Sequence, residues 1–143
     1  MKNAHKDFNK LNSVCSDRLS FASVKIAIDL VWWNVGHMGG VESYCKNLLK
    51  GFSKYSPSSL SFILLASVDN ASYIESLGLS DAFEVRLIKT NSYQKIRTMF
   101  FQYFNICEIA AEFGADLLFV PTPIYPVRRG RIPIIVTVHD LQF

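Results

Sequence analysis

Two adjacent glycines stand where a ligand can meet the backbone. Gly39 and Gly40 lie between an apolar run, residues 24–32, and a segment whose apolar residues recur at helical spacing. Glycine tolerates positive φ and close approach, and the first turn of a helix offers free N–H groups at the positive end of its dipole. This combination suits a phosphate or a sugar hydroxyl. A tight turn without a ligand is the alternative.

A histidine near the end of the chain is the second candidate. His139 follows residues 134–138, an apolar run that predicts a buried strand, and so stands at the carboxyl end of that strand. Its ring could donate a hydrogen bond to a sugar hydroxyl or carbonyl, and Asp140 could orient the ring or cap a following helix. A structural histidine satisfied by backbone groups is the alternative. His37, inside the glycine loop, is a weaker candidate.

Several neighbouring residues have a structural interpretation beside a functional one. Glu42 lies in the first helical turn, where a carboxylate favours the helix dipole, and a catalytic role is the weaker interpretation. Trp32 and Trp33 end the first apolar run, and a tryptophan exposed there could stack on a sugar. A basic cluster could bind a phosphate or an anionic lipid headgroup, although a solvated loop is the favoured interpretation. The cluster comprises Arg128, Arg129 and Arg131.

Spacing and charge argue against several classes of protein. The glycines follow the pattern Gly36-x-x-Gly39-Gly40, which matches neither G-x-G-x-x-G nor G-x-x-x-x-G-K-[ST]. This argues against a nicotinamide dehydrogenase and against a nucleoside triphosphatase. The net charge of +3 and the pI of about 8.8 are too mild to indicate a nucleic-acid partner.

The composition predicts one globular domain. The chain has 143 residues, of which 50% are hydrophobic and 19% charged. Residues 1–22 form a polar tail without the apolar segment of a secretory signal, and residues 23–143 form the domain. No apolar run reaches the roughly 18 residues that span a bilayer. The three cysteines (Cys15, Cys45 and Cys107) show no C-x-x-C pairing, which argues against a disulfide framework or a zinc site. Core packing is expected for the last two, in a reducing, cytoplasmic setting.

Apolar periodicity predicts alternating strands and helices. The predicted strands are residues 24–32, 60–66, 83–88, 117–120 and 134–138, and the predicted helices are residues 41–52, 70–77 and 92–113. This alternation favours a Rossmann-like, doubly wound α/β fold with a parallel sheet. Ligands of such sheets bind beyond the carboxyl ends of the strands, so the loops 33–40, 121–131 and 139–143 should share one edge.

The predicted helix 92–113 has two distinct faces. Ser92 is the expected N-cap, and Gly114 follows the last turn. The apolar stripe comprises Ile96, Met99, Phe100, Tyr103, Phe104, Cys107, Ala110 and Ala111. Phe101, Lys95 and Arg97 face away from the stripe. Contact of this second face with a membrane surface is one interpretation, and packing of Phe101 against neighbouring structure is the favoured one.

Four segments occur in an order and spacing that a known family shares. Residues 25–29 read K-I-A-I-D, and residues 39–49 read G-G-V-E-S-Y-C-K-N-L-L; residues 116–121 read D-L-L-F-V-P, and residues 133–141 read P-I-I-V-T-V-H-D-L. From about residue 24 to its last residue the chain resembles the N-terminal domain of GT-B fold glycosyltransferases of family 4. In that family the second segment often reads G-G-[IV]-E-x-[YF]-x-x-x-L, and the last contains H-D-L.

The resemblance implies a retaining glycosyltransferase. Such an enzyme moves a hexose from a UDP- or GDP-sugar to a saccharide or lipid-linked acceptor in cell-surface polysaccharide synthesis. Gly39 and Gly40 would approach the donor phosphates and sugar, His139 would contact the transferred sugar, and Asp140 would belong to the substrate-binding residues. No metal is implied, and no cofactor besides the nucleotide-sugar. A cytoplasmic protein with a peripheral contact at the inner face of the membrane is expected.

The sequence departs from the family pattern at its end. The family's second domain binds most of the nucleotide and carries an E-x7-E motif, to which nothing in the chain up to Phe143 corresponds. We therefore expect an N-terminal half truncated after its fifth strand, whose donor-binding domain is supplied in cis or in trans. The alternatives are an acceptor-binding subunit of a split glycosyltransferase and an inactive α/β remnant.

Overall fold

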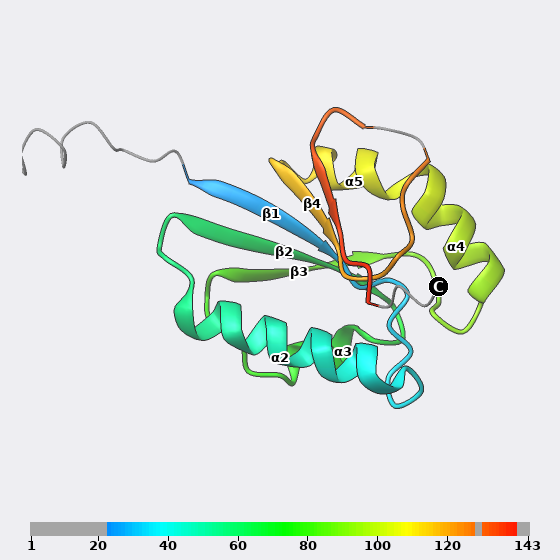
Figure 1. Cartoon of the computed structure of the whole chain (residues 1–143), viewed down its shortest axis with the longest axis horizontal. Coiled ribbons are helices and arrows are strands. Elements are labelled where there is room, and N and C mark those ends of the chain that lie inside the picture. The colour runs from blue at the N-terminus through cyan, green and yellow to red at the C-terminus, as the bar shows by residue number, and fades with distance from the viewer. Residues whose placement is uncertain (1–22, 128–129, 140–143) are drawn as a thin grey trace, which may run out of the picture.

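A parallel sheet forms the centre of the protein (Figure 1). The computed structural model describes residues 23–127 and 130–139, and in this part of the chain the sheet has five strands. The strands are β1 (Val24–Asp29), β2 (Leu60–Ser67), β3 (Phe83–Ile88), β4 (Leu117–Val120) and β5 (Ile134–Val136). Their spatial order is β3-β2-β1-β4-β5, and each pairing is parallel. The predicted Rossmann-like α/β fold is confirmed.

Helices cover both faces of the sheet (Figure 1). They are α2 (Gly39–Tyr55), α3 (Ala71–Glu75), α4 (Lys95–Phe104) and α5 (Ile106–Glu112). Successive side chains of a strand point to opposite faces, so Phe62 of β2 joins the core under α2 and α3, while Ile63 joins the core under α5. The two cores together bury the middle strands on both sides, which explains their continuous apolar runs.

Two strands end earlier than the apolar runs predict. β1 stops at Asp29 because the chain turns there, and the Trp32 indole N–H donates to the Asp29 carbonyl oxygen at 2.8 Å. β5 stops at Val136 because its neighbour β4 ends at Val120. The Val120 carbonyl accepts a last hydrogen bond from the Thr137 N–H at 2.9 Å. A strand extends only as far as its partner does, and the pattern of a single segment does not contain that information.

The predicted helix 92–113 is two helices. They are separated by Asn105, whose φ of −121° departs from helical values. Gly114 follows α5 with a φ of 78°, as expected of a glycine just past a helix. Ser92 is not the N-cap, because α4 begins three residues later and the Ser92 N–H and hydroxyl both bind the Asp69 carboxylate.

α4 turns its polar side to the protein and its apolar side to solvent. Thr98 and Gln102 are 3% and 1% exposed, whereas Ile96 and Phe100 are 71% and 56% exposed. Met99 and Phe104 are the other exposed large side chains of the stripe. The predicted stripe is therefore buried only in α5. Phe101, on the other side of α4, packs against the core, as favoured from the sequence.

Candidate functional site

The strand order contains a reversal of direction between β1 and β4. From β1 the chain crosses to β2 through α2, on one face of the sheet. It reaches β4, on the other side of β1, through α4 and α5 on the opposite face. Open α/β sheets bind their ligands beyond the carboxyl ends of the strands at such a switch point. The predicted loops 33–40 and 121–131 follow β1 and β4 and so flank it.

The loop after β1 leaves the start of α2 open. Gly36 and Gly39 have φ of 81° and 55°, and Gly39 and Gly40 are the first two residues of the helix. Met38, the N-cap residue, makes no side-chain capping bond. Apart from the chain neighbours and the backbone of α2 itself, nothing lies within 4 Å of the place where a Cβ of Gly39 or Gly40 would stand. A phosphate or a hydroxyl can therefore approach the backbone of this first turn closely.

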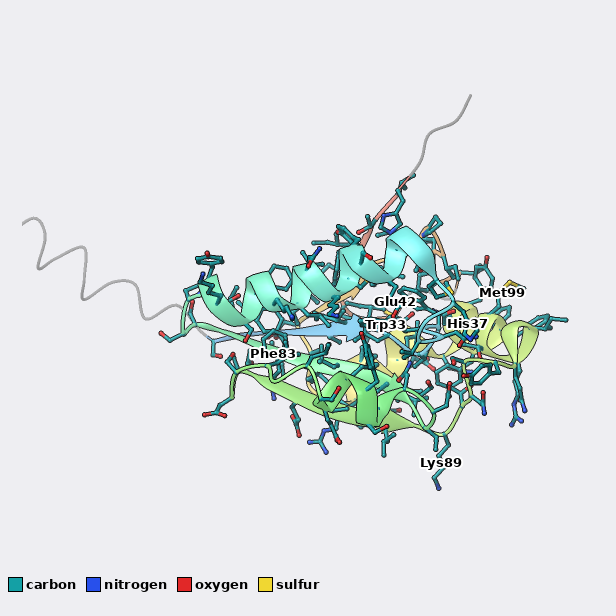
Figure 2. The ribbon with its side chains drawn as sticks, turned by 90° about the horizontal axis from the view of Figure 1, so that it is seen from below. Trp33, His37, Glu42, Phe83, Lys89 and Met99 are labelled. Carbon is teal, nitrogen blue, oxygen red and sulfur yellow. The ribbon has the colours of Figure 1, made fainter. Side chains whose placement is uncertain are left out.

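The Glu42 side chain connects this loop to the helix through a hydrogen bond. Its Oε2 accepts a hydrogen bond from the Gly36 N–H at 2.9 Å, and Figure 2 shows the side chain in the first part of α2, near the loop that carries His37. The carboxylate also lies at the positive end of the helix dipole. Glu42 thus shapes the glycine loop. The sequence indicates its helical position but not its partner.

His139 connects the segments that follow β4 and β5 with α2. Its Nε2 lies 2.7 Å from the carbonyl oxygen of Pro121, the first residue after β4. Its ring packs edge-on against the ring of Tyr44, with centroids 4.8 Å apart. Tyr44 lies in the second turn of α2, and its hydroxyl is 3.5 Å from Thr137 Oγ1. The structure therefore brings His139 to the helix that begins with the two predicted glycines.

The bond to Pro121 determines what the His139 ring can offer to a ligand. A carbonyl oxygen only accepts hydrogen bonds, so Nε2 carries a proton and Nδ1 of the neutral ring is an acceptor. The neutral ring can accept a bond from a sugar hydroxyl, and the imidazolium can donate one from Nδ1. The expectation that His139 donates to a sugar therefore applies only to its charged form. The alternative, a structural histidine whose ring is hydrogen-bonded to the backbone, is correct for Nε2.

Four buried polar atoms at this edge have no hydrogen-bond partner in the described part of the chain. Trp33 Nε1 and Asn34 Oδ1 lie in the loop after β1, Ser67 Oγ lies at the end of β2, and Thr122 Oγ1 lies in the loop after β4. Buried polar atoms are nearly always hydrogen-bonded, so each is a group that a ligand hydroxyl or a water molecule could satisfy. The sequence predicts that the loops after β1 and β4 share one edge, but no local pattern shows which of their polar side chains are buried without a partner.

Asn70 ties the loop after β1 to the end of β2. Its side-chain N–H groups donate to the Leu30 carbonyl at 2.8 Å and to the Trp33 carbonyl at 2.9 Å. Its Oδ1 accepts from the Ser67 N–H at 3.0 Å. The side chain is fully buried, so these bonds hold the base of the glycine loop rigidly. Asn70 is the first residue of the predicted helix 70–77, and an asparagine at the start of a helix is the signal that could have identified it.

A buried carboxyl group ends β1. Asp29 Oδ2 accepts from Gln102 Nε2 at 2.6 Å, and Oδ1 accepts from the Val31 N–H at 3.2 Å. Burial raises the pKa of Asp29 to about 6, although both hydrogen bonds act in the opposite direction. The candidates predicted from the sequence do not include Asp29. An acidic side chain inside an apolar run was the available signal.

The other sequence candidates do not join this arrangement. Trp32 and Trp33 are buried in the core on the α2 side, so neither can stack on a sugar, and Figure 2 shows Trp33 beneath α2. His37 and Arg131 are exposed. Arg128, Arg129, Asp140 and the rest of the last predicted loop lie outside the described residues.

Cys45 and Cys107 pack in the core, as predicted. Cys45 and Cys107 are free and buried, and burial raises the pKa of the Cys45 thiol to about 12, so it does not ionise near neutral pH. Cys15 lies outside the described residues. Within residues 23–127 and 130–139, no three His, Cys, Asp or Glu side chains are grouped so that they could hold a metal ion.

Comparisons with known proteins find no family model, curated protein or solved structure that matches the chain. None of the helices in the described ranges has the length and apolar character needed to cross a bilayer. The fold and the contacts around His139 are therefore the observations on which a function is proposed.

Proposed function

We propose that this chain is the N-terminal, acceptor-side domain of a retaining GT-B glycosyltransferase. It would help to move a hexose from a UDP- or GDP-sugar to a saccharide or lipid-linked acceptor. The observation that carries the proposal is the position of His139, which contacts Tyr44 and Pro121. Tyr44 belongs to α2, the helix whose open first turn contains Gly39 and Gly40. A histidine and a helix N-terminus beside a topological switch point suit a polyol that carries a phosphate.

The proposed roles follow from the chemistry of each group. The N–H groups at Gly39 and Gly40 would approach the donor diphosphate, where the helix dipole favours negative charge. His139 Nδ1 would bond a hydroxyl of the transferred sugar, because Nε2 is engaged by Pro121. Tyr44 would hold the ring in place through its edge-on contact. Asp140 would be a further substrate contact.

The proposal includes a donor-binding domain supplied in cis or in trans. Ile135 and Val138, in and just after the edge strand β5, are both more than half exposed. Exposed apolar residues on an edge strand favour association with another folded unit. If that unit is a separate chain, this protein would be the acceptor-binding subunit of a split glycosyltransferase. The proposed setting is the cytoplasm, at the inner face of the membrane, which the buried free thiols of Cys45 and Cys107 support.

Ligand titration of the isotope-labelled protein tests the proposal. We expect UDP-hexoses, GDP-hexoses or short saccharides to shift the amide signals of Gly39, Gly40 and His139. His139→Ala should weaken the responsible ligand by about fivefold to tenfold, the effect of one lost hydrogen bond. His37→Ala is the matched control, because this exposed histidine lies in the glycine loop outside the Tyr44 contact. Shifts confined to other parts of the protein, or equal effects of the two variants, would contradict the assignment.

A further inference from the structure

The apolar face of α4 is the least expected surface of the molecule. Ile96 and Phe100 lie on it, and the rings of Phe100 and Phe104 stack with centroids 6.1 Å apart. Tyr93, just before the helix, is 60% exposed and lines a shallow hollow with Ile96 and Arg97. Large apolar side chains scattered singly over a surface are ordinary, but a cluster on one helix indicates an interaction site.

Buried polar contacts fix α4 in this orientation. The Thr98 hydroxyl donates to the Asn91 carbonyl at 2.8 Å and lies 3.4 Å from the Thr90 hydroxyl. Gln102 donates to the buried Asp29 carboxyl group. Rotating the helix to bury its apolar stripe would break these bonds and leave Asp29 without its side-chain partner. The exposed stripe is therefore a stable feature of the fold.

The charged residues of the segment that contains the stripe are all basic. Residues 88–107 contain three basic residues, Lys89, Lys95 and Arg97, and no acidic residue. Lys89 and Arg97 are exposed, and Figure 2 shows Lys89 and Met99 at the outer side of the molecule, toward the end where α4 lies. An apolar helix face with aromatic residues and flanking cations is the pattern of a helix that lies in the interface of an anionic bilayer.

We propose that the exposed face of α4 docks onto the surface of an anionic lipid bilayer. Ile96, Phe100 and Phe104 would enter the boundary between headgroups and acyl chains, and Arg97 would meet the lipid phosphates. This face differs from the Phe101 face considered from the sequence, which is packed against the core. A second copy of the chain is a poorer occupant, because symmetric contact through this face would bring the cations of both copies together.

Docking would also place the candidate site near the membrane. Gln102 of α4 bonds to Asp29, and Asp29 ends the strand that leads into the glycine loop. This consequence rests on the proposed function, in which a lipid-linked acceptor would reach the site from the bilayer. The docking itself does not depend on sugar transfer, so its test requires no activity.

Vesicle binding by the whole chain tests the proposal. We expect the protein to sediment with vesicles of phosphatidylcholine and phosphatidylglycerol, and much less with phosphatidylcholine alone or at high salt. Ile96→Ser combined with Phe100→Ser should lower the partition coefficient by about tenfold or more, through lost apolar burial. Arg97→Glu changes the charge by two and should lower it by roughly thirtyfold on the anionic vesicles. A Phe100→Trp variant should shift its emission to the blue on binding.

The controls separate docking from unfolding and from other contacts. Tyr55→Ser is the matched control, because Tyr55 is a 75% exposed aromatic residue at the far end of α2. It should bind as the wild type does, and circular dichroism should show that all variants remain folded. Binding unaffected by the α4 changes, or no binding to anionic vesicles, would overturn the proposal. So would a concentration-dependent dimer that the α4 changes abolish, because the face would then join two copies.

Discussion

Replacement of Asp29 by asparagine should remove a pH dependence from the stability of the protein. Asp29 is fully buried, and its pKa rises from 3.8 to about 6 on folding. The folded state therefore holds this proton more tightly than the unfolded state does, so the protonated group contributes stability that is present below pH 3.8. That stability is lost as the pH rises through 6.

The magnitude follows from the two pKa values. At about 1.36 kcal/mol per pKa unit, the shift of Asp29 from 3.8 to about 6 amounts to a loss of about 3 kcal/mol once the group is ionised. About 2.4 kcal/mol of this loss falls between pH 4 and pH 7. The asparagine side chain of the variant would not ionise. Its amide can still accept from Val31 and meet Gln102 if the Gln102 amide turns over.

Urea unfolding at several pH values provides the assay. The emission of the buried Trp32 and Trp33 reports unfolding. The free energy of unfolding of Asp29→Asn, minus that of the wild type, should increase by about 2.4 kcal/mol from pH 4 to pH 7. Taking the difference cancels the other titrating groups. A difference that does not change with pH would refute the reasoning, because Asp29 would then titrate normally in the folded protein.

Asp69→Asn is a comparison of opposite sign for this assay. Burial raises the pKa of Asp69, but its hydrogen bonds, chiefly from Ser92, outweigh this effect and lower the pKa overall. Its contribution to stability is therefore present above the unfolded pKa and is lost as the pH falls. The asparagine variant should be less stable than the wild type at neutral pH, and the two should converge in acid.

Two glycine substitutions test the backbone and the packing. Gly39→Ala should destabilise the protein by about 1–2 kcal/mol in thermal unfolding, because Gly39 has a φ of 55°; equal stability of Gly39→Ala and Gly40→Ala would contradict this. Gly130→Ala should cost about 1–3 kcal/mol, because its Cβ would lie 2.6 Å from Cys107 Sγ. Adding Cys107→Ala should recover part of that loss, so purely additive effects of the two changes would refute the proposed clash.

The sequence predicts the sheet well because its middle strands are buried on both faces and read as short apolar runs. The edge strand β3 alternates apolar and polar residues instead, and the alternation of strands with helices implies parallel pairing. It also predicts that His139 lies at the edge near Gly39 and Gly40, since parallel strands bring their carboxyl ends together. The contacts of His139 with Tyr44 and Pro121 depend on side-chain placement that no local pattern specifies.

The orientation of α4 shows what periodicity leaves undetermined. Helical spacing identifies Ile96, Phe100 and Phe104 as neighbours on one face, but it does not state whether that face points inward. The deciding partner of Gln102 is Asp29, which lies 73 residues earlier in the chain. A pairing over such a distance is invisible to reasoning that treats each helix alone.

The energies involved indicate why the apolar stripe of α4 requires a partner. Fully burying one large apolar side chain stabilises a protein by about 1.5–3 kcal/mol, and the stripe leaves Ile96, Met99, Phe100 and Phe104 exposed. A hydrogen bond to a charged group contributes about 1.5–3 kcal/mol, so the bond from Gln102 to Asp29 alone does not offset that exposure. Burial of the stripe would therefore still lower the free energy of the protein. A bilayer with anionic headgroups can bury these side chains and also attract the charge of Arg97.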